Sequence, residues 1–113
     1  MHEMSLCESV LQVLETEAKR QQFHQVKTVW LEIGAMSGVE IEAMRFCFDV
    51  IVRNTLADGA TLQVIEVPAE AWCLDCAQTV KIQQRYDTCP HCGSCQLQVI
   101  RGEEMRIKEL EVA

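Results

Sequence analysis

Two pairs of cysteines constrain this chain more than any other feature of its sequence. Cys73 and Cys76 are separated by two residues, as are Cys89 and Cys92, and twelve residues lie between the pairs. Two intervening residues let both thiolates of a pair face one ion, and two such pairs complete the tetrahedral four-thiolate shell of structural zinc. That shell leaves no open position for a substrate, so we predict a stabilising zinc. The gap is slightly shorter than is usual, but a single hairpin through "TVKIQQRYDT" can span it.

The residues around the second pair favour a tight knuckle and add two alternative ligands. In "CPHCG", Pro90 fixes φ and Gly93 tolerates the turn after the second ligand. Cys95 repeats the two-residue spacing once more, and His91 lies inside the pair. We expect a bystander thiol and a solvated imidazole, with exchange of either into the zinc shell as the alternative. A thiol-redox pair is a further alternative, and it would need a lowered thiol pKa.

The rest of the chain predicts an α+β fold. Apolar residues at helical spacing predict two helices, and stretches rich in β-branched and aromatic residues predict three strands. The helices are expected at 6–18 and 41–51, and the strands at 26–34, 61–67 and 104–112. In the last strand the apolar alternation changes phase near Lys108 and Glu109, which a β-bulge would reconcile.

Layered packing of these elements gives a three-stranded sheet with two helices on one face. We assign this domain to residues 1–69 with 100–113. Residues 70–99 are expected to form the inserted zinc-ribbon module, with its four cysteine ligands.

Two S-x-x-E sequences predict where the helices begin. Ser5 and Glu8 fit a capping box with Ser5 as the N-cap, so the first helix should start near residue 6. Residues 1–4 would then form a free arm. Ser37 and Glu40 fit a second capping box, at the start of the second helix.

The N-terminal sequence "MHE" places several nitrogen donors close together. The amine of Met1, the amide nitrogen of His2 and the imidazole of His2 lie at chelating distances along the chain, and the Glu3 amide or a side chain could supply a fourth donor. Planar nitrogen ligation suits Ni(II) or Cu(II), whereas zinc is satisfied by tetrahedral thiolates. Taken alone, a histidine in second position is an ordinary exposed residue.

Composition and charge exclude several classes of protein. The net charge of −7 is a poor match for phosphate backbones, so we expect no nucleic-acid partner. No apolar run approaches the roughly 20 residues of a membrane span, and the start lacks a signal peptide. Seven cysteines in an intracellular protein favour metal ligation over disulfides. No nucleophile with a neighbouring base stands out, so we do not expect an enzyme.

Six stretches of the chain together resemble a known family. These are "MHEMSLC", "VWLEIGAMSGVE", "FCFDV", "AWCLDC", "CPHCG" and "IKELEV". They occur in the order found in the HypA/HybF family of nickel metallochaperones for [NiFe]-hydrogenase maturation, and the resemblance covers nearly the whole chain. It implies an α/β nickel domain with an inserted zinc ribbon. The cytoplasmic location is expected separately, from the lack of a membrane span and of a signal peptide.

The resemblance also implies ligands and partners. Nickel would be bound by the Met1 amine, the His2 amide and imidazole and the Glu3 amide, with Glu40 at an acidic position linked to this site. Zinc would be bound by Cys73, Cys76, Cys89 and Cys92. The implied partners are a nickel-handling GTPase and the hydrogenase large-subunit precursor, and some members also serve urease. Monomer and homodimer both stay open. The rival interpretations are a zinc-ribbon protein-interaction module and a thiol-redox protein.

Overall fold

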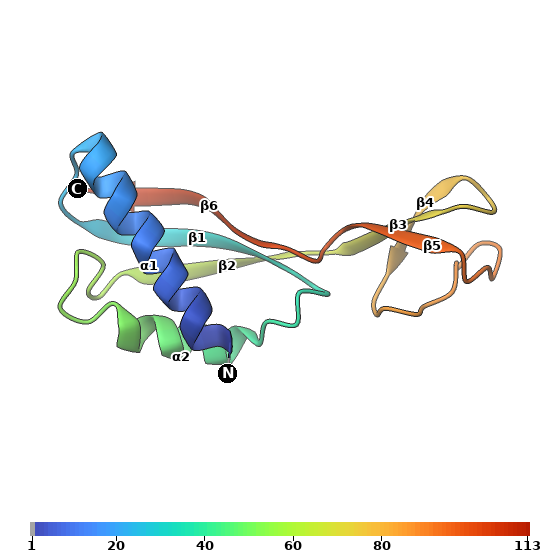
Figure 1. Ribbon diagram of the computed structural model, residues 1–113, viewed down its shortest axis with the longest axis horizontal. Helices are drawn as coiled ribbons and strands as arrows, with labels where there is room; N and C mark the ends of the chain where they lie inside the picture. The colour runs from blue at the N-terminus through green and yellow to red at the C-terminus, as the bar shows by residue number, and fades with distance from the viewer. Residues whose placement is uncertain (1) are drawn as a thin grey trace. The chain divides into compact units, whose positions relative to one another are not determined.

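The computed structural model describes residues 2–113 and contains two helices and six strands in this part of the chain (Figure 1). The strands form two three-stranded sheets, with the orders β2-β1-β6 and β4-β3-β5. The elements are α1 (His2–Gln21), β1 (Val26–Gly34), α2 (Ile41–Ile51), β2 (Thr61–Val67), β3 (Ala69–Cys73), β4 (Gln78–Ile82), β5 (Leu97–Arg101) and β6 (Met105–Val112).

The chain divides into two compact units. The first comprises residues Met1–Leu31, Glu40–Val64 and Ile107–Ala113, and the second comprises Glu32–Val39 and Ile65–Arg106. Within residues 2–113, neither helix is long and apolar enough to cross a membrane.

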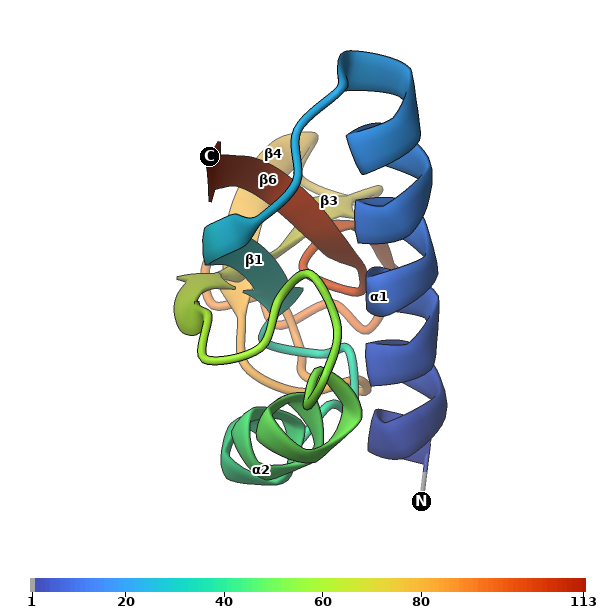
Figure 2. The ribbon, with the colours of Figure 1, turned by 90° about the vertical axis from the view of Figure 1, so that its left-hand side faces the viewer.

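The first unit contains both helices, which lie on one side of the sheet β2-β1-β6 (Figure 2). Each helix buries an apolar stripe, and the sulfur of Cys7 in α1 lies 3.6 Å from the sulfur of Met44 in α2. The predicted α+β class, with two helices on one face of a three-stranded sheet, is therefore confirmed. The buried helical residues are Cys7, Val10 and Leu14 in α1 and Met44, Cys47 and Phe48 in α2.

The first helix begins earlier than its sequence predicts. α1 starts at His2, so the predicted N-cap at Ser5 and the predicted free arm are wrong for residues 2–4; Met1 lies outside the described residues. Ser5 instead lies within the helix, where its carbonyl accepts a hydrogen bond from the Ser9 hydroxyl. The physical reason is tertiary: Glu3 is buried, and its carboxylate accepts a hydrogen bond from the backbone N–H of Glu40.

The second helix begins at the predicted place but with a different cap. Glu40 itself is the N-cap, in an extended conformation, and its carboxylate accepts a hydrogen bond from the backbone N–H of Ala43. The predicted capping box with Ser37 as the N-cap is therefore wrong. The Ser37 hydroxyl accepts instead from the N–H of Val39, two residues on, which is a local turn of the kind that serine favours.

The strands of the first sheet have the predicted bounds to within one residue. β1 occupies the centre, where Val29, Leu31 and Ile33 are buried in alternation. In β6 the burial pattern changes phase where Lys108 and Glu109 are both exposed, as the apolar sequence pattern indicates. The β-bulge proposed to reconcile the two phases stays a prediction.

The second unit is built around the sheet β4-β3-β5. β3 pairs antiparallel with both neighbours, and its pairing with β5 is irregular between Glu70 and Ala71. The residues on one face form a small buried core: Ala69, Ala71, Cys73, Val80, Ile82 and Cys89. The predicted hairpin through "TVKIQQRYDT" is wrong, because this segment supplies only the end of β4, whose partner β3 precedes it and ends at Cys73.

Candidate metal centres

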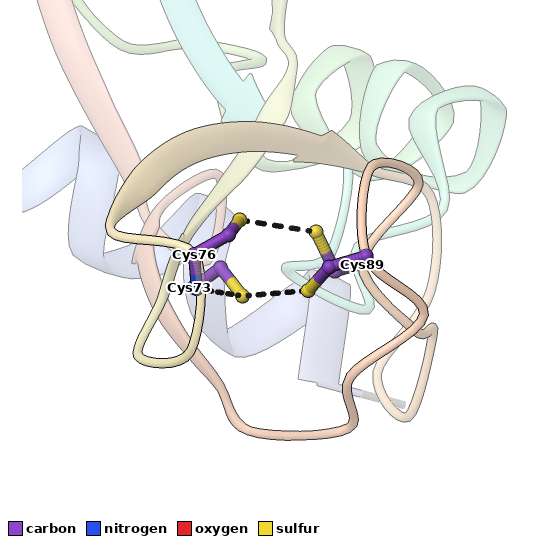
Figure 3. Close-up of side chains that lie close together, drawn as sticks. Cys73, Cys76 and Cys89 are labelled. Carbon is purple, nitrogen blue, oxygen red and sulfur yellow. Dashed lines mark hydrogen bonds between the residues drawn. The ribbon is translucent and has the colours of Figure 1, made fainter.

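Four thiols of the second unit converge on one point. The sulfurs of Cys73, Cys76, Cys89 and Cys92 all lie within 4.8 Å of one another. Cys73 and Cys92 are 3.6 Å apart, and Cys76 and Cys89 are 3.7 Å apart (Figure 3). Ligands of a tetrahedral ion with Zn–S bonds of about 2.3 Å are separated by about 3.8 Å. The two sulfur–sulfur distances that join one cysteine pair to the other therefore match a tetrahedral thiolate shell.

The two knuckles share the hydrogen bond to the carbonyl of the first cysteine from the residue four positions later, and differ in which residue donates to its sulfur. In each, the first cysteine accepts two backbone hydrogen bonds, one at its sulfur and one at its carbonyl, and the donor to the carbonyl has a positive φ. In the first knuckle the N–H of Cys76 donates to the Cys73 sulfur at 3.5 Å, and the N–H of Ala77 (φ 54°) donates to the Cys73 carbonyl at 2.9 Å. In the second knuckle the N–H of His91 donates to the Cys89 sulfur at 3.4 Å, and the N–H of Gly93 (φ 74°) donates to the Cys89 carbonyl at 2.8 Å.

Polar contacts also join the two knuckles. The Ser94 hydroxyl, which follows the second knuckle, donates to the carboxylate of Asp75 inside the first. The Ser94 carbonyl accepts from the N–H of Cys89 at 2.8 Å, and the N–H of Leu74 donates to the Gln96 carbonyl at 3.0 Å. These bonds hold the two cysteine pairs face to face. No local pattern predicts this role of Asp75 and Ser94, since nothing in the sequence distinguishes them from other knuckle residues.

Two of these thiols, Cys89 and Cys76, have pKa values shifted in opposite directions. Burial raises the pKa of Cys89, but the backbone N–H groups of Cys92 and His91 outweigh it and bring this pKa down to about 6. Burial, followed by the neighbouring sulfurs, raises the pKa of Cys76 to about 12. One thiolate is thus stabilised while a second thiol keeps its proton. A cation among the sulfurs would displace that proton, because metal-bound thiols ionise.

The two alternative ligands stand apart from this group. Cys95 and His91 are both exposed, and neither belongs to the four converging groups. His91 contributes its backbone N–H to the Cys89 sulfur rather than its imidazole.

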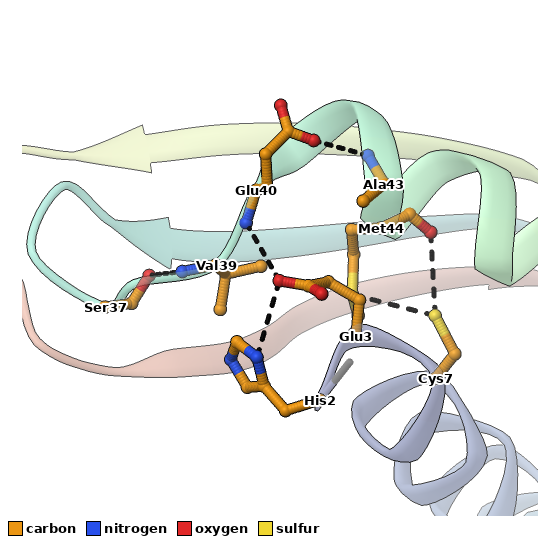
Figure 4. Close-up of polar contacts among 8 residues, drawn as sticks. All are labelled: His2, Glu3, Cys7, Ser37, Val39, Glu40, Ala43 and Met44. Atoms are coloured by element: carbon orange, nitrogen blue, oxygen red, sulfur yellow. Dashed lines mark hydrogen bonds and ion pairs between the residues drawn. The ribbon is translucent and has the colours of Figure 1, made fainter.

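The N-terminal candidate residues meet at the start of the two helices. Figure 4 shows the Glu3 carboxylate between His2 and Glu40: its Oε2 atom lies 3.4 Å from Nδ1 of His2 and accepts the N–H of Glu40 at 3.2 Å. The His2 side chain is 55% exposed, whereas Glu3 is only 8% exposed. The Glu40 carboxylate belongs to the cap and lies 2.6 Å from the N–H of Ala43.

The Glu3 side chain thus belongs to this site. The sequence predicted it only as an alternative to the Glu3 amide as fourth nickel donor. Its hydrogen bond from Glu40, followed by one from its own backbone, holds the pKa of Glu3 below its usual range. A signal for it was present in the sequence. Glu3 precedes Cys7 by four residues and so continues the buried stripe of Cys7, Val10 and Leu14 at helical spacing.

Comparison with known proteins places the whole chain in one family. The family model described as "Hydrogenase/urease nickel incorporation, metallochaperone, hypA" matches residues 1–112. Proteins named hydrogenase maturation factor HypA from Alkalilimnicola ehrlichii and Azotobacter chroococcum are 59% and 55% identical to it, over 99% of each chain.

Solved structures agree with these relatives. The solution structure of the nickel metallochaperone HypA from Helicobacter pylori superposes with a TM-score of 0.73 at 29% identity, covering 99% of this chain and 97% of that one. A second solution structure of a HypA protein gives a TM-score of 0.75, also at 29% identity. The resemblance drawn from the sequence motifs is confirmed: the chain belongs to the HypA family of nickel metallochaperones in hydrogenase maturation.

Proposed function

We propose that this chain binds Ni(II) at its N-terminus and delivers the ion during maturation of a [NiFe]-hydrogenase, while a zinc ion held by the four converging cysteines stabilises the second unit. The observation that carries the proposal is the position of His2. Its half-exposed imidazole is on the first described residue of α1, beside a buried carboxylate. Few donors beside a half-exposed imidazole suit a cargo ion, since an incoming partner can replace them one at a time.

The proposed nickel donors are the Met1 amine, the His2 amide and imidazole, and the Glu3 amide. The first amides of a helix have no intrahelical carbonyl acceptor, so ligation by the amides of His2 and Glu3 breaks no backbone–backbone hydrogen bond of α1. It would replace only the bond from the Glu3 N–H to its own carboxylate. A planar set of nitrogens is the geometry that Ni(II) prefers. Glu40 would act beside this set, and the contact that supports its role is the one from its backbone N–H to Glu3.

Zinc would be held by Cys73, Cys76, Cys89 and Cys92, whose separations fit a tetrahedral shell. Bound there, the ion would cross-link the two knuckles. Because Cys73 and Cys89 also belong to the buried core of the second unit, the cross-link would stabilise the sheet β4-β3-β5. Four thiolates leave no open position for a substrate, which supports a structural role and a protein that is not an enzyme.

The family and the printed names of the relatives, hydrogenase maturation factor HypA, support partners from the same pathway. We propose a nickel-handling GTPase as the partner that supplies nickel or acts together with this chain, and the hydrogenase large-subunit precursor as the nickel recipient. Both interactions would take place in the cytoplasm. We further propose that residues 1–69 with 100–113 act as the nickel domain and residues 70–99 as the zinc domain.

The test is a nickel titration of zinc-loaded protein with a native, untagged N-terminus. Binding is measured by calorimetry and by the visible spectrum. The variant is His2→Ala, and the matched control is His24→Ala, an exposed histidine in the loop between α1 and β1. Wild type and the control should bind one equivalent with the spectrum of planar Ni(II), and His2→Ala should lose it. Equal binding by all three would move nickel to other residues, and no binding by any would leave a zinc-stabilised interaction module.

A further inference from the structure

A single oxygen atom of Glu3 serves two partners. Oε2 accepts the backbone N–H of Glu40 at 3.2 Å and lies 3.4 Å from Nδ1 of His2 (Figure 4). Glu40 is the N-cap of α2, so this oxygen connects the first residues of α1 to the first turn of the other helix. The three residues all belong to the first unit.

The burial of Glu3 indicates that this arrangement is specific. A carboxylate removed from water costs free energy unless hydrogen bonds replace the lost solvation. Glu3 nevertheless occupies the buried stripe of α1, four residues before Cys7, at a position where an apolar side chain would dock the helix more simply. A docking role alone would also need only the bond to Glu40, whereas the same oxygen faces the imidazole.

The nitrogen that it faces is the one that matters for chelation. Nδ1 closes a six-membered ring with the backbone amide of the same histidine around a metal ion, whereas Nε2 is too far along the ring to do so. Nickel bound through Nδ1 therefore competes with the contact between His2 and Glu3. Loss of that contact leaves Oε2 with the N–H of Glu40 as its partner.

We infer that Glu3 is a positioning residue of the nickel site, whose carboxylate orients the His2 imidazole before loading and transmits loading to the backbone of Glu40. The inference rests on the proposed function, since it requires nickel at the N-terminus. The Glu3 carboxylate acts without ligating the metal, whereas the Glu3 amide is one of the proposed donors, so the visible spectrum of planar Ni(II) does not depend on the carboxylate.

The experiment follows the backbone amide of Glu40 by NMR while Ni(II) is added to zinc-loaded, ¹⁵N-labelled protein with a native N-terminus. Planar Ni(II) is diamagnetic, so the resonances stay sharp. In wild type the Glu40 amide resonance should move in step with nickel binding. In Glu3→Ala the planar spectrum should persist, the nickel affinity should fall by about 10- to 100-fold, as is typical when an outer partner of a metal ligand is removed, and the Glu40 resonance should no longer respond to nickel.

Two further variants keep the result interpretable. Glu3→Gln retains an oxygen that can accept the Glu40 N–H, so it should recover part of the Glu40 response even if Glu3→Ala disturbs the first turn of α1. Glu8→Gln, an exposed glutamate on the same helix, should behave as wild type.

Each other outcome overturns the inference. A Glu40 resonance that does not move in wild type would mean that Glu3 only docks the helix. Wild-type affinity and response in Glu3→Ala would remove Glu3 from the site, and loss of the planar spectrum in both Glu3 variants would make its carboxylate a ligand. Failure of the proposed function has a different signature, which is a nickel spectrum that His2→Ala leaves unchanged.

Discussion

Gly34 packs so closely against the backbone of Gly102 that it cannot carry a side chain, and Gly102 is restricted in the same way by Ala69. A Cβ on Gly34 would lie 2.9 Å from the Cα of Gly102 and closer still to its carbonyl, and a Cβ on Gly102 would lie 2.5 Å from the Cα of Ala69. The Gly102 carbonyl accepts the N–H of Met36 at 2.8 Å, so it cannot turn aside without losing that bond. These residues all belong to the second unit.

Gly34→Ala should therefore lower the free energy of unfolding by at least about 2 kcal/mol, as overpacking against immobile backbone does. The measurement is urea unfolding of the zinc-loaded protein. Gly38→Ala is the matched control, because Gly38 has a φ of +76° but nothing within 4 Å of its virtual Cβ. It should cost only about 1 kcal/mol, the strain of a left-handed alanine. Equal losses in the two variants would show that the crossing relaxes freely.

The Glu40 carboxylate should matter for the stability of α2 and not for nickel binding. It caps the helix through the N–H of Ala43, and replacing an N-cap by alanine costs about 1 kcal/mol. Glu40→Ala should thus lower Tm by about 4 °C and leave the stoichiometry and visible spectrum of nickel unchanged. Glu42→Ala, an exposed position in the first turn of α2, should change Tm less. A Glu40→Ala protein with normal Tm and no planar nickel spectrum would make this carboxylate a ligand.

The strands and the cysteine group could be predicted because their signals are local. β1 and β2 have the predicted bounds, since runs of β-branched residues between turn residues have few other stable conformations. The spacing of Cys73, Cys76, Cys89 and Cys92 likewise predicts the convergence that the structure describes, because a tight knuckle brings both thiols of a pair to one side.

The start of α1 could not be predicted because it depends on a tertiary contact, whereas α2 begins at the predicted residue. Ser5 has every local feature of an N-cap, but the bond between Glu3 and the backbone of Glu40 extends α1 past it. That bond joins residues 37 positions apart, and no window of the sequence contains both. The hairpin expected after Cys76 fails for a different reason. β4 pairs with the preceding strand β3 across the first cysteine pair, with Cys73 opposite Gln78, so the hairpin is local but lies earlier in the chain than predicted.

Thiol reactivity should separate the seven cysteines into three classes. In zinc-loaded protein, only the exposed Cys95 should react with an aromatic disulfide reagent. A zinc chelator should release the four converging thiols of the second unit. Cys7 and Cys47 should react only after denaturation, because both are buried, and burial, with smaller effects of Cys47 and Glu3, raises the pKa of Cys7 to about 12.

Cys95→Ser is the control for this assignment. It should abolish the first class and leave the zinc content at one ion per chain, because Cys95 is outside the converging group. Zinc loss in Cys95→Ser would make this thiol an exchanging ligand. Two reactive thiols in the zinc-loaded wild type, oxidised together to a disulfide, would favour the thiol-redox interpretation.

The bond between Glu3 and Glu40 should make the stability of the first unit depend on pH in a defined window. The hydrogen bond from Glu40 lowers the pKa of Glu3 from its ordinary value of 4.5, so the folded state binds this proton less readily than the unfolded state. The stabilisation is therefore complete above about pH 4.5 and is lost as the pH falls through the lower pKa of the folded state.

Unfolding free energies of wild type and Glu3→Gln, measured from pH 7 to pH 3 by denaturant titration, should differ most above pH 4.5 and converge below it. Glu8→Gln, an exposed residue of the same helix, should run parallel to wild type throughout. A difference between wild type and Glu3→Gln that stays constant with pH would show that the charge of Glu3 contributes nothing to docking α1 on α2.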